Sequence, residues 1–257
     1  MSRRRSGAEL GMALAEWTLA AMLGVILLAA ALTWLQGSLQ MALVQRVPLQ
    51  MAGDAAWLFR RLELAALQAG RGGAHPLGND DARLAPWRMT DGSGPGTPAS
   101  DQLLLRRRLE AGTLDCEGRR LAVGTDMVER YFLRADSSAS GLVLACDAGF
   151  CDAAGCHDLG DAGAALLSEV DSFQVLYAAI TEAALAPGYV DATSWLAQPA
   201  PPRLLALRVG LLLRSRESVA RPRRWSLPAD WLGHDLRSAS DRQAHSAWQQ
   251  TLAVPHG

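Results

Sequence analysis

The feature that most constrains this chain is a long uncharged stretch near its N-terminus. No charged residue occurs from Trp17 to Gln45, and the segment from Trp17 to Leu35 is almost continuously apolar. A helix over residues 12–37 would be about 39 Å long at 1.5 Å per residue, which exceeds a hydrocarbon core of about 30 Å. A buried helix of a soluble domain rarely needs so long an uncharged stretch. The segment therefore indicates a membrane-spanning or export role.

The charges that flank this stretch indicate its orientation. Arg3, Arg4 and Arg5 precede it, whereas Arg46 is the only basic residue soon after it. Because positively charged flanks stay on the cytoplasmic side, we expect the N-terminus in the cytoplasm and the large C-terminal part across the inner membrane, in the periplasm. The formal net charge of −1 lacks the basic excess of nucleic-acid-binding proteins, so no nucleic acid is expected as a direct partner.

A carboxylate stands at the start of the apolar stretch. Glu16 would cost up to about 2.5–3.5 kcal/mol if it were unpaired at the centre of a membrane helix, and less near the interface. Gly11 lies five residues before it, in the segment GMALAEW. This pattern resembles the type III signal of type IV prepilins. The resemblance implies cleavage after Gly11 by the prepilin peptidase, methylation, and a mature protein that begins at Met12 and keeps the apolar stretch.

Cleavage after Gly11 would place a new amine at Met12, four residues from Glu16 on one helical face. The carboxylate would then have a cationic partner, either its own terminus or that of a neighbouring subunit. Two other interpretations of the segment stay open. One is an ordinary signal anchor, and the other is a secretory signal peptide cut near Ala29-Ala30-Ala31. The second is less favoured because the stretch from Leu32 to Val44 stays apolar.

The rest of the chain divides by pattern into a helix, a loop and a strand-rich head. Small and aliphatic residues recur with the helical period at Ala55, Leu58, Leu62, Ala65 or Ala66, and Ala69. Pro48 should kink or break this helix. Glycine and proline are concentrated in residues 70–100 and predict a connecting loop. We therefore assign residues 1–11 to a leader, 12–69 to the N-terminal helix with 12–35 in the membrane, 70–100 to the loop and 101–257 to the head.

Strand patterns begin at Asp101. The clearest alternation places Leu205, Leu207, Val209, Leu211 and Leu213 on one side. Shorter runs predict strands at 128–132, 141–146, 173–177 and 248–254. Turn-rich loops rather than helices separate these runs, so the sheet should be mainly antiparallel. The expected fold class is α+β: a long N-terminal helix, membrane-spanning in its first half, packed on a mainly antiparallel β-sheet head.

The order of segments in the head is similar to that of type IV pilus minor pilins of the PilW class. The resembling segments are 52–69, SDQL at 100–103, LDCEG at 114–118, ERYFL at 129–133, GLVLAC at 141–146, VDSFQVLY at 170–177, YVDA at 189–192 and ALRVGLLLRS at 206–215. The resemblance implies a type IV pilin-like fold and a minor pilin that works in pilus assembly. Its implied partners are other minor pilins, the major pilin and the prepilin peptidase, with a tip adhesin as a further candidate. Its implied final location is the pilus fibre, at the tip.

Two rival functions stay open. A pseudopilin of a type II secretion system would share the signal and the architecture. A single-pass envelope sensor or binding protein that never polymerises would keep its N-terminus uncut and would not require Glu16. An enzyme is not expected, because the sequence contains no base–nucleophile pattern and no phosphate-binding glycine loop; no cofactor is expected either.

The cysteines are Cys116, Cys146, Cys151 and Cys156, all in the predicted head. An even number in an oxidising compartment predicts disulfides. The first choice is a cross-strand Cys116–Cys146 bond with a small local Cys151–Cys156 ring, although four cysteines allow three pairings. A metal site built from Cys146, Cys151, Cys156 and His157 is disfavoured by its wide spacing and its compartment.

Other clusters are given structural interpretations. Four aspartates in one loop could hold calcium, but they lack the spacing of an EF-hand, so a solvated acidic loop is preferred and no metal site is assigned; these are Asp147, Asp152, Asp158 and Asp161. The five histidines are scattered and are expected on the surface: His75, His157, His234, His245 and His256. Four tryptophans are expected in the core, with partner contact as the alternative: Trp195, Trp225, Trp231 and Trp248.

Overall fold

The computed structural model of the chain describes residues 6–69, 100–109, 112–137, 141–179, 188–196, 204–218, 223–225, 231–232 and 239–255. The chain divides into two compact units, Met1–Leu49 and Gln50–Gly257. Residues 70–99 of the predicted connecting loop and residues 1–5 of the predicted leader lie outside the described residues. So do His75, His234 and His256.

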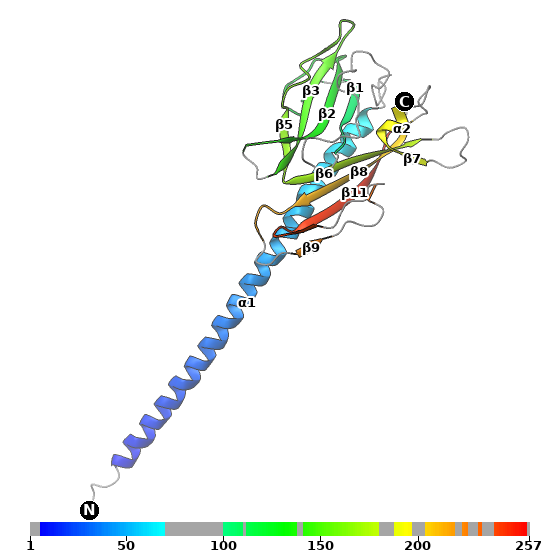
Figure 1. The fold of residues 1–257 in the computed structure, drawn as a ribbon. Coiled ribbons are helices and arrows are strands. Elements are labelled where there is room, and N and C mark those ends of the chain that lie inside the picture. The colour runs from blue at the N-terminus through cyan, green and yellow to red at the C-terminus, as the bar shows by residue number, and fades with distance from the viewer. Residues whose placement is uncertain are drawn as a thin grey trace, which may run out of the picture. The chain divides into compact units, whose positions relative to one another are not determined.

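The first unit is built from the N-terminal part of one helix. Helix α1 (Ser6–Ala69) is drawn in blue to cyan in Figure 1 and continues through Pro48. Side chains from Glu16 to Leu39 are all exposed. The expected break at Pro48 does not occur. Proline removes one backbone donor, and the helical hydrogen bonds on either side of it keep both parts helical.

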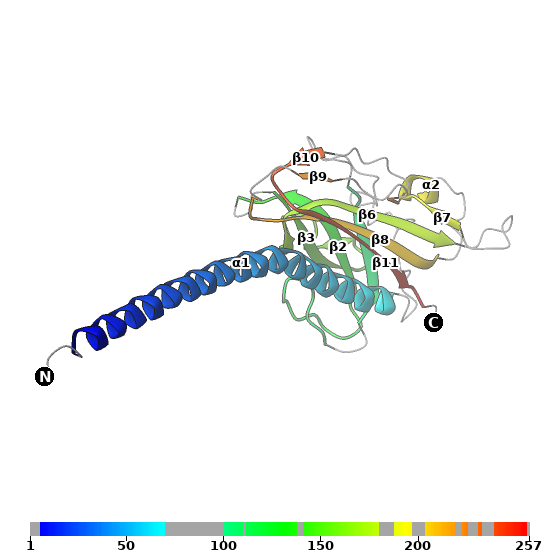
Figure 2. The same ribbon diagram turned by 90° about the horizontal axis from the view of Figure 1, so that it is seen from below.

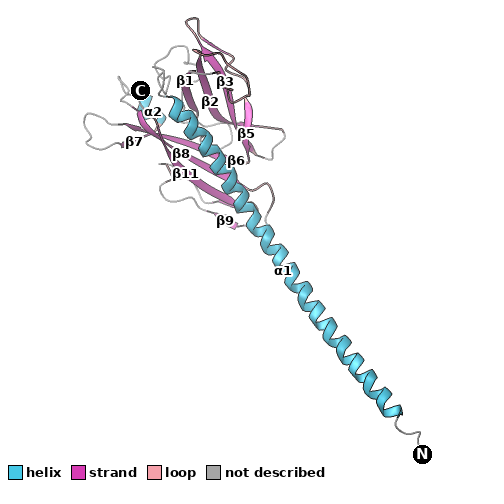
Figure 3. Cartoon of the chain, turned by 180° about the vertical axis from the view of Figure 1, so that it is seen from behind, coloured by secondary structure: helices cyan, strands magenta, loops and turns pink. Residues whose placement is uncertain are grey.

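The second unit begins with the C-terminal part of α1, and the predicted apolar stripe is its buried face. Ala55, Leu58, Leu62, Ala66 and Ala69 are each at most 1% exposed, and Ala65 is also buried. Arg60, which lies off the stripe, is exposed. Figure 3 shows this part of α1 lying across strands of the head. The helical period therefore identified correctly which side of the helix contacts the sheets.

The first sheet has five described strands: β1 (Leu103–Arg108), β2 (Asp126–Ala135), β3 (Leu142–Cys151), β4 (Cys156–His157) and β5 (Ala164–Ser168). Its order is β1-β2-β3-β4, and β5 also pairs with β3. Every pairing is antiparallel. Strand β3 is central and almost fully buried, as its apolar run predicts.

The second sheet has four described strands: β6 (Val170–Ala179), β7 (Gly188–Val190), β8 (Leu204–Arg214) and β11 (His245–Ala253). Its order is β11-β8-β6-β7, and all its pairings are antiparallel. Helix α2 (Ala192–Leu196) follows β7. A separate pair consists of β9 (Arg223–Trp225) and β10 (Ala239–Asp241). Figure 2 shows both sheets from below.

The expected α+β class, with a long N-terminal helix and an antiparallel head, is confirmed. Each run predicted as a strand lies largely or wholly inside one, namely β2, β3, β6, β8 or β11. One point differs: the head contains two larger sheets rather than one. The sheets meet where Asp101 donates its backbone N–H to the Phe173 carbonyl at 2.8 Å and its carboxylate accepts the Val175 N–H at 2.7 Å.

Strand β8 is buried on both faces in its middle. Of the residues predicted to share one side, Leu207, Val209 and Leu211 are fully buried, but so is Leu212 on the opposite face. Trp231 and Leu232 cover this second face. A Cβ at Gly210 would overlap the Leu232 side chain, so glycine is needed there for the close approach. Trp231 is therefore a core residue, as expected, and so is Trp195 at 3% exposure.

One buried carboxylate holds α1 on the first sheet. Glu129 of β2 is 3% exposed and accepts a hydrogen bond from the Tyr131 hydroxyl at 3.0 Å. Arg107 of β1 and Arg61 of α1 lie at 3.7 and 3.9 Å from the same carboxylate. Burial raises the pKa of Tyr131 well above its usual value, and the negative charge of Glu129 adds to this. The charge of Glu129 is thus compensated from two other elements.

Candidate functional site

The apolar segment of α1 is the first candidate site. Among the described residues, Glu16–Leu39 forms the only helix segment long and apolar enough to cross a membrane, judged by length and composition. Trp17, Leu27 and Trp34 are 79%, 70% and 74% exposed. Soluble monomers rarely present so large a contiguous apolar surface to water. The segment therefore requires either lipid or neighbouring apolar helices around it.

Gly11, Met12 and Glu16 all lie within α1. Residues 12 and 16 are about one turn apart in the sequence of α1, so the two positions share one helical face. Glu16 is exposed and is the only charged residue from position 16 to position 45. A positive charge at residue 12, or on another helix beside this face, would lie within reach of its carboxylate.

A polar residue farther along the segment is satisfied within the helix. The Thr33 hydroxyl donates to the Ala30 carbonyl at 2.8 Å. Such internal bonding makes a hydroxyl compatible with an apolar surrounding. A carboxylate has no proton to donate when ionised, so Glu16 needs a donor or a cation instead.

The four cysteines form two disulfides, with the pairing that was the first choice. Cys116–Cys146 joins the turn after β1 to β3, and Cys151–Cys156 joins the end of β3 to β4. The first closes a separation of 30 residues; in the chain-entropy description such a loop contributes about 3–4 kcal/mol. Because all four thiols are consumed, the alternative metal site with His157 lacks its sulfur ligands.

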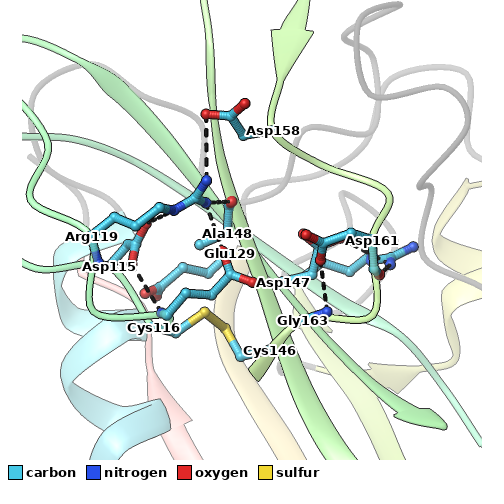
Figure 4. A network of polar contacts seen from close by, with 12 residues as sticks. Asp115, Cys116, Arg119, Glu129, Cys146, Asp147, Ala148, Asp158, Asp161 and Gly163 are labelled. Carbon is cyan, nitrogen blue, oxygen red and sulfur yellow. Dashed lines mark hydrogen bonds and ion pairs between the residues drawn. A yellow bond between two sulfur atoms is a disulfide. The ribbon is translucent and has the colours of Figure 1, made fainter. Parts of the chain in front are cut away.

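A network of charged residues surrounds the Cys116–Cys146 disulfide (Figure 4). Arg119 contacts three carboxylates: Asp115 at 3.0 Å, Glu117 at 2.7 Å and Asp158 at 3.4 Å. It also donates to the Ala148 carbonyl. Asp115 in turn accepts the backbone N–H groups of Glu117 and Arg119 at 2.9 and 2.8 Å. The turn after Leu114 is therefore held by its own side chains.

Asp147 is the buried member of this network. It directly follows Cys146 and is 0% exposed. Its Oδ2 atom accepts from Arg130 at 2.9 Å and from the Gly160 N–H at 2.9 Å. Burial raises the pKa of Asp147, and the neighbouring Asp161 adds to this against the lowering effect of Arg130. Burial likewise raises the pKa of Glu117, with Arg119 opposing and Asp161 and Asp147 reinforcing the shift.

The structure corrects the surface assignment of His245. Its side chain is 4% exposed, with Nδ1 at 3.0 Å from Asp171 and Nε2 at 2.8 Å from Asp241. Trp225 stacks on its ring with a centroid distance of 4.3 Å. Burial opposes the imidazolium, but the two carboxylates outweigh it, so the pKa of His245 is raised above its usual 6.5. His157, by contrast, is exposed.

The acidic loop is only partly brought together as its sequence suggests. Asp147 and Asp161 lie in one cluster, but the third carboxylate within 4.8 Å of them is Glu117. Asp152 instead accepts the Ala154 N–H at 2.8 Å and contacts His157 at 3.1 Å. A signal for Glu117 was present in the sequence. Glu117 directly follows Cys116, and Asp147 directly follows Cys146. The predicted disulfide between these cysteines therefore already implied that the two carboxylates are neighbours.

Comparisons with known proteins give a likeness of shape. No family model and no curated protein matches the sequence. Among solved structures, a type IV-like pilin, TTHA1219 from Thermus thermophilus, is similar at 18% identity and a TM-score of 0.39. The alignment covers 62% of this chain and 81% of that chain.

Proposed function

We propose that the chain is a pilin-type subunit, and specifically a minor pilin of the PilW class that acts in a priming and tip complex of a type IV pilus. One observation carries the proposal. Helix α1 runs unbroken from an exposed apolar part of membrane-spanning length into a part whose inner face is buried in the head. The same helix can therefore be a membrane anchor, a contact element and a core element. A cleavable secretory signal would not need that continuity.

The proposed mechanism begins with cleavage after Gly11 on the cytoplasmic side. The new amine at Met12 then supplies a positive charge, and the apolar stretch keeps the chain in the inner membrane. Glu16 pairs with its own terminal amine or with that of the preceding subunit. Because an unpaired carboxylate is costly among apolar helices, the subunits are drawn to the axial register in which this pair forms.

Apolar side chains from Trp17 to Leu39 then pack against equivalent helices of other minor pilins and the major pilin. Their present exposure is the surface that such packing would cover. The head lies in the periplasm, where its two disulfides are stable. It presents contact surfaces rather than a catalytic site, and the complex leaves the membrane at the tip of the fibre.

Fractionation tests this function. The chain with a C-terminal epitope is produced in a host with a type IV pilus system, with and without the prepilin peptidase. We expect it in the sheared surface fibres only when the peptidase is present, and in the inner membrane otherwise. Retention in the inner membrane under both conditions would contradict the proposal and favour a non-polymerising envelope protein. Recovery only in fibres of a type II secretion system would identify a pseudopilin.

A further inference from the structure

Three carboxylates from separate parts of the head converge beside the Cys116–Cys146 disulfide. Glu117 lies in the turn after β1, Asp147 in β3, and Asp161 before β5. One oxygen from each lies within 4.8 Å of the others. Figure 4 shows Asp147 and Asp161 around this disulfide. Since Ca²⁺ binds oxygens at about 2.3–2.6 Å, two oxygens up to about 5 Å apart can share one ion.

The charges around this cluster do not balance. Five carboxylates, those of residues 115, 117, 147, 158 and 161, surround the guanidinium groups of Arg119 and Arg130. Arg119 contacts three of them and Arg130 contacts Asp147. Arg134, nearby, is paired with Asp136 at 2.7 Å. Five negative and two positive charges leave an excess of three negative charges when all are ionised.

One carboxylate oxygen of Asp147 is buried without a hydrogen-bond partner among the described residues. Asp147 is fully buried, and its Oδ2 atom is satisfied by Arg130 and Gly160. Its Oδ1 atom is also buried and has no hydrogen-bond partner among the described residues. Buried carboxylate oxygens are normally paired or bound to a metal ion.

We propose that Glu117, Asp147 and Asp161 form a binding site for a divalent cation of the calcium type. All three offer oxygen ligands, which suit Ca²⁺, whereas zinc sites are built mainly from sulfur and nitrogen ligands. Ca²⁺ also tolerates irregular geometry, with water completing its shell, while Mg²⁺ demands a near-ideal octahedron. Asp161 is exposed and gives the ion a route in from solvent. The site does not depend on the role in pilus assembly.

An ion there would link three segments of the head that the first disulfide holds only in part. The Glu117 turn and strand β3 are already joined through Cys116–Cys146. The segment that carries Asp161 has no disulfide to β3 and is held by hydrogen bonds, among them Gly160 N–H to Asp147 at 2.9 Å and Arg130 to the Asp161 carbonyl at 3.2 Å. Binding to the folded state alone stabilises it by mass action. The loop between β4 and β5 should therefore gain the most protection from hydrogen exchange.

Calorimetric titration of CaCl₂ into the full chain tests the site, after purification in detergent with both disulfides intact and dialysis against EDTA. We expect one ion per chain with Kd of about 10⁻⁴ to 10⁻³ M, the range of extracellular calcium modules. MgCl₂ should bind at least tenfold more weakly. Absence of calcium binding up to about 10 mM would overturn the proposal.

Matched variants separate a defined site from diffuse charge attraction. Glu117→Ala and Asp161→Ala each remove the ligand oxygens and one negative charge, whereas an amide would keep a carbonyl oxygen that calcium can bind, and each should weaken calcium binding at least tenfold. Asp158→Asn removes the same charge from the network without removing a ligand and should change Kd less than threefold. Equal effects of all three variants would overturn the site. Melting temperatures in EDTA verify that each variant is folded, and a calcium-induced rise in the wild type should be lost in the ligand variants.

Discussion

At the scale of single residues, the ionisable groups of Glu16 and His245 lie in two different surroundings. Glu16 is exposed at the start of an uncharged stretch, with no other charged residue as far as position 45. His245 is buried between Asp171 and Asp241, which come from β6 and β10. In the proposed mechanism the first charge gains its partner on assembly, whereas the second already has its partners within the head.

Replacing Glu16 by alanine should lower incorporation of the chain into fibres by at least about tenfold, because the register-setting pair with the terminal amine is lost. The head should keep its melting temperature, since Glu16 lies in the other compact unit. Thr33→Ala is the matched control, because it removes a polar group of the same helix that is bonded internally. Normal incorporation of Glu16→Ala in sheared fibres would rule out the role assigned to this carboxylate.

The His245 site predicts a pH dependence of stability. Because its folded pKa is raised above 6.5, its contribution is fully present below about pH 6.5 and is lost as the pH rises through the folded pKa. Hydrogen bonds to a charged group contribute about 1.5–3 kcal/mol. Urea unfolding of wild type and His245→Gln at several pH values should show a difference that shrinks as the pH rises. The Nε atom of Arg214 also lies 3.5 Å from Asp171. Because Arg214 is present in both proteins, its charge does not account for a difference between them. A difference independent of pH would contradict this.

The surroundings of a single residue could be predicted only where the residues near it in sequence indicate them. The cysteine pairing was reached from the positions of the cysteines at strand edges. The environment of His245 was missed because Asp171 lies on a strand far away in sequence and Trp225 lies on another. No local pattern indicates that three such segments meet. The acidic cluster was found in part, because three of its five acids lie close together in sequence, between positions 147 and 161, whereas Asp115 and Glu117 lie beside the other end of the disulfide.

At the scale of elements, α1 carries two different surfaces. Its first part exposes apolar side chains in all directions, whereas its second part buries one stripe and leaves the remaining side chains half-buried or exposed. The stripe follows from the 3.6-residue period, since residues three and four apart share a face. Glu129, with Arg61 and Arg107, adds a charged contact beside this stripe. The face of the helix that carries this stripe is therefore the one that packs on the sheets and joins the core.

Leu62→Ala should destabilise the head by about 2–5 kcal/mol, because it removes a fully buried side chain and leaves a cavity between α1 and the sheets. Leu64→Ala deletes the same atoms from a side chain that is 45% exposed, and surface changes of this kind usually cost about 0.5 kcal/mol or less. Denaturant unfolding of both variants in the same detergent measures the difference. Equal destabilisation would contradict the burial of one face only.

Long strands could be predicted from the sequence and short ones could not. β8 has 11 residues and β6 has 10, which is enough for alternation to be visible. β4 has 2 residues, and β7, β9 and β10 have 3 each, which is too short for any period. Strand order was also outside the reach of local patterns. Pairing of β6 with β8, and of β8 with β11, depends on contacts between distant segments.

At the scale of the whole molecule, the chain joins a compact head to an apolar helix that no described part of the chain covers from Glu16 to Leu39. The head has its own core, two disulfides and a helix face to close it. The apolar helix has none of these and must be covered by lipid or by other subunits. The proposed function in assembly uses this division, because the surface that one chain leaves uncovered is the one that other chains would cover.

Mass spectrometry of the mature N-terminus, from membranes made with and without the prepilin peptidase, tests this account most directly. The account predicts a terminal peptide beginning at Met12 only when the peptidase is present, with the helix from Trp17 onward intact in the mature chain. An uncut chain in both preparations, or a mature chain that begins near Leu32, would contradict it, because neither provides the amine that Glu16 is proposed to pair with.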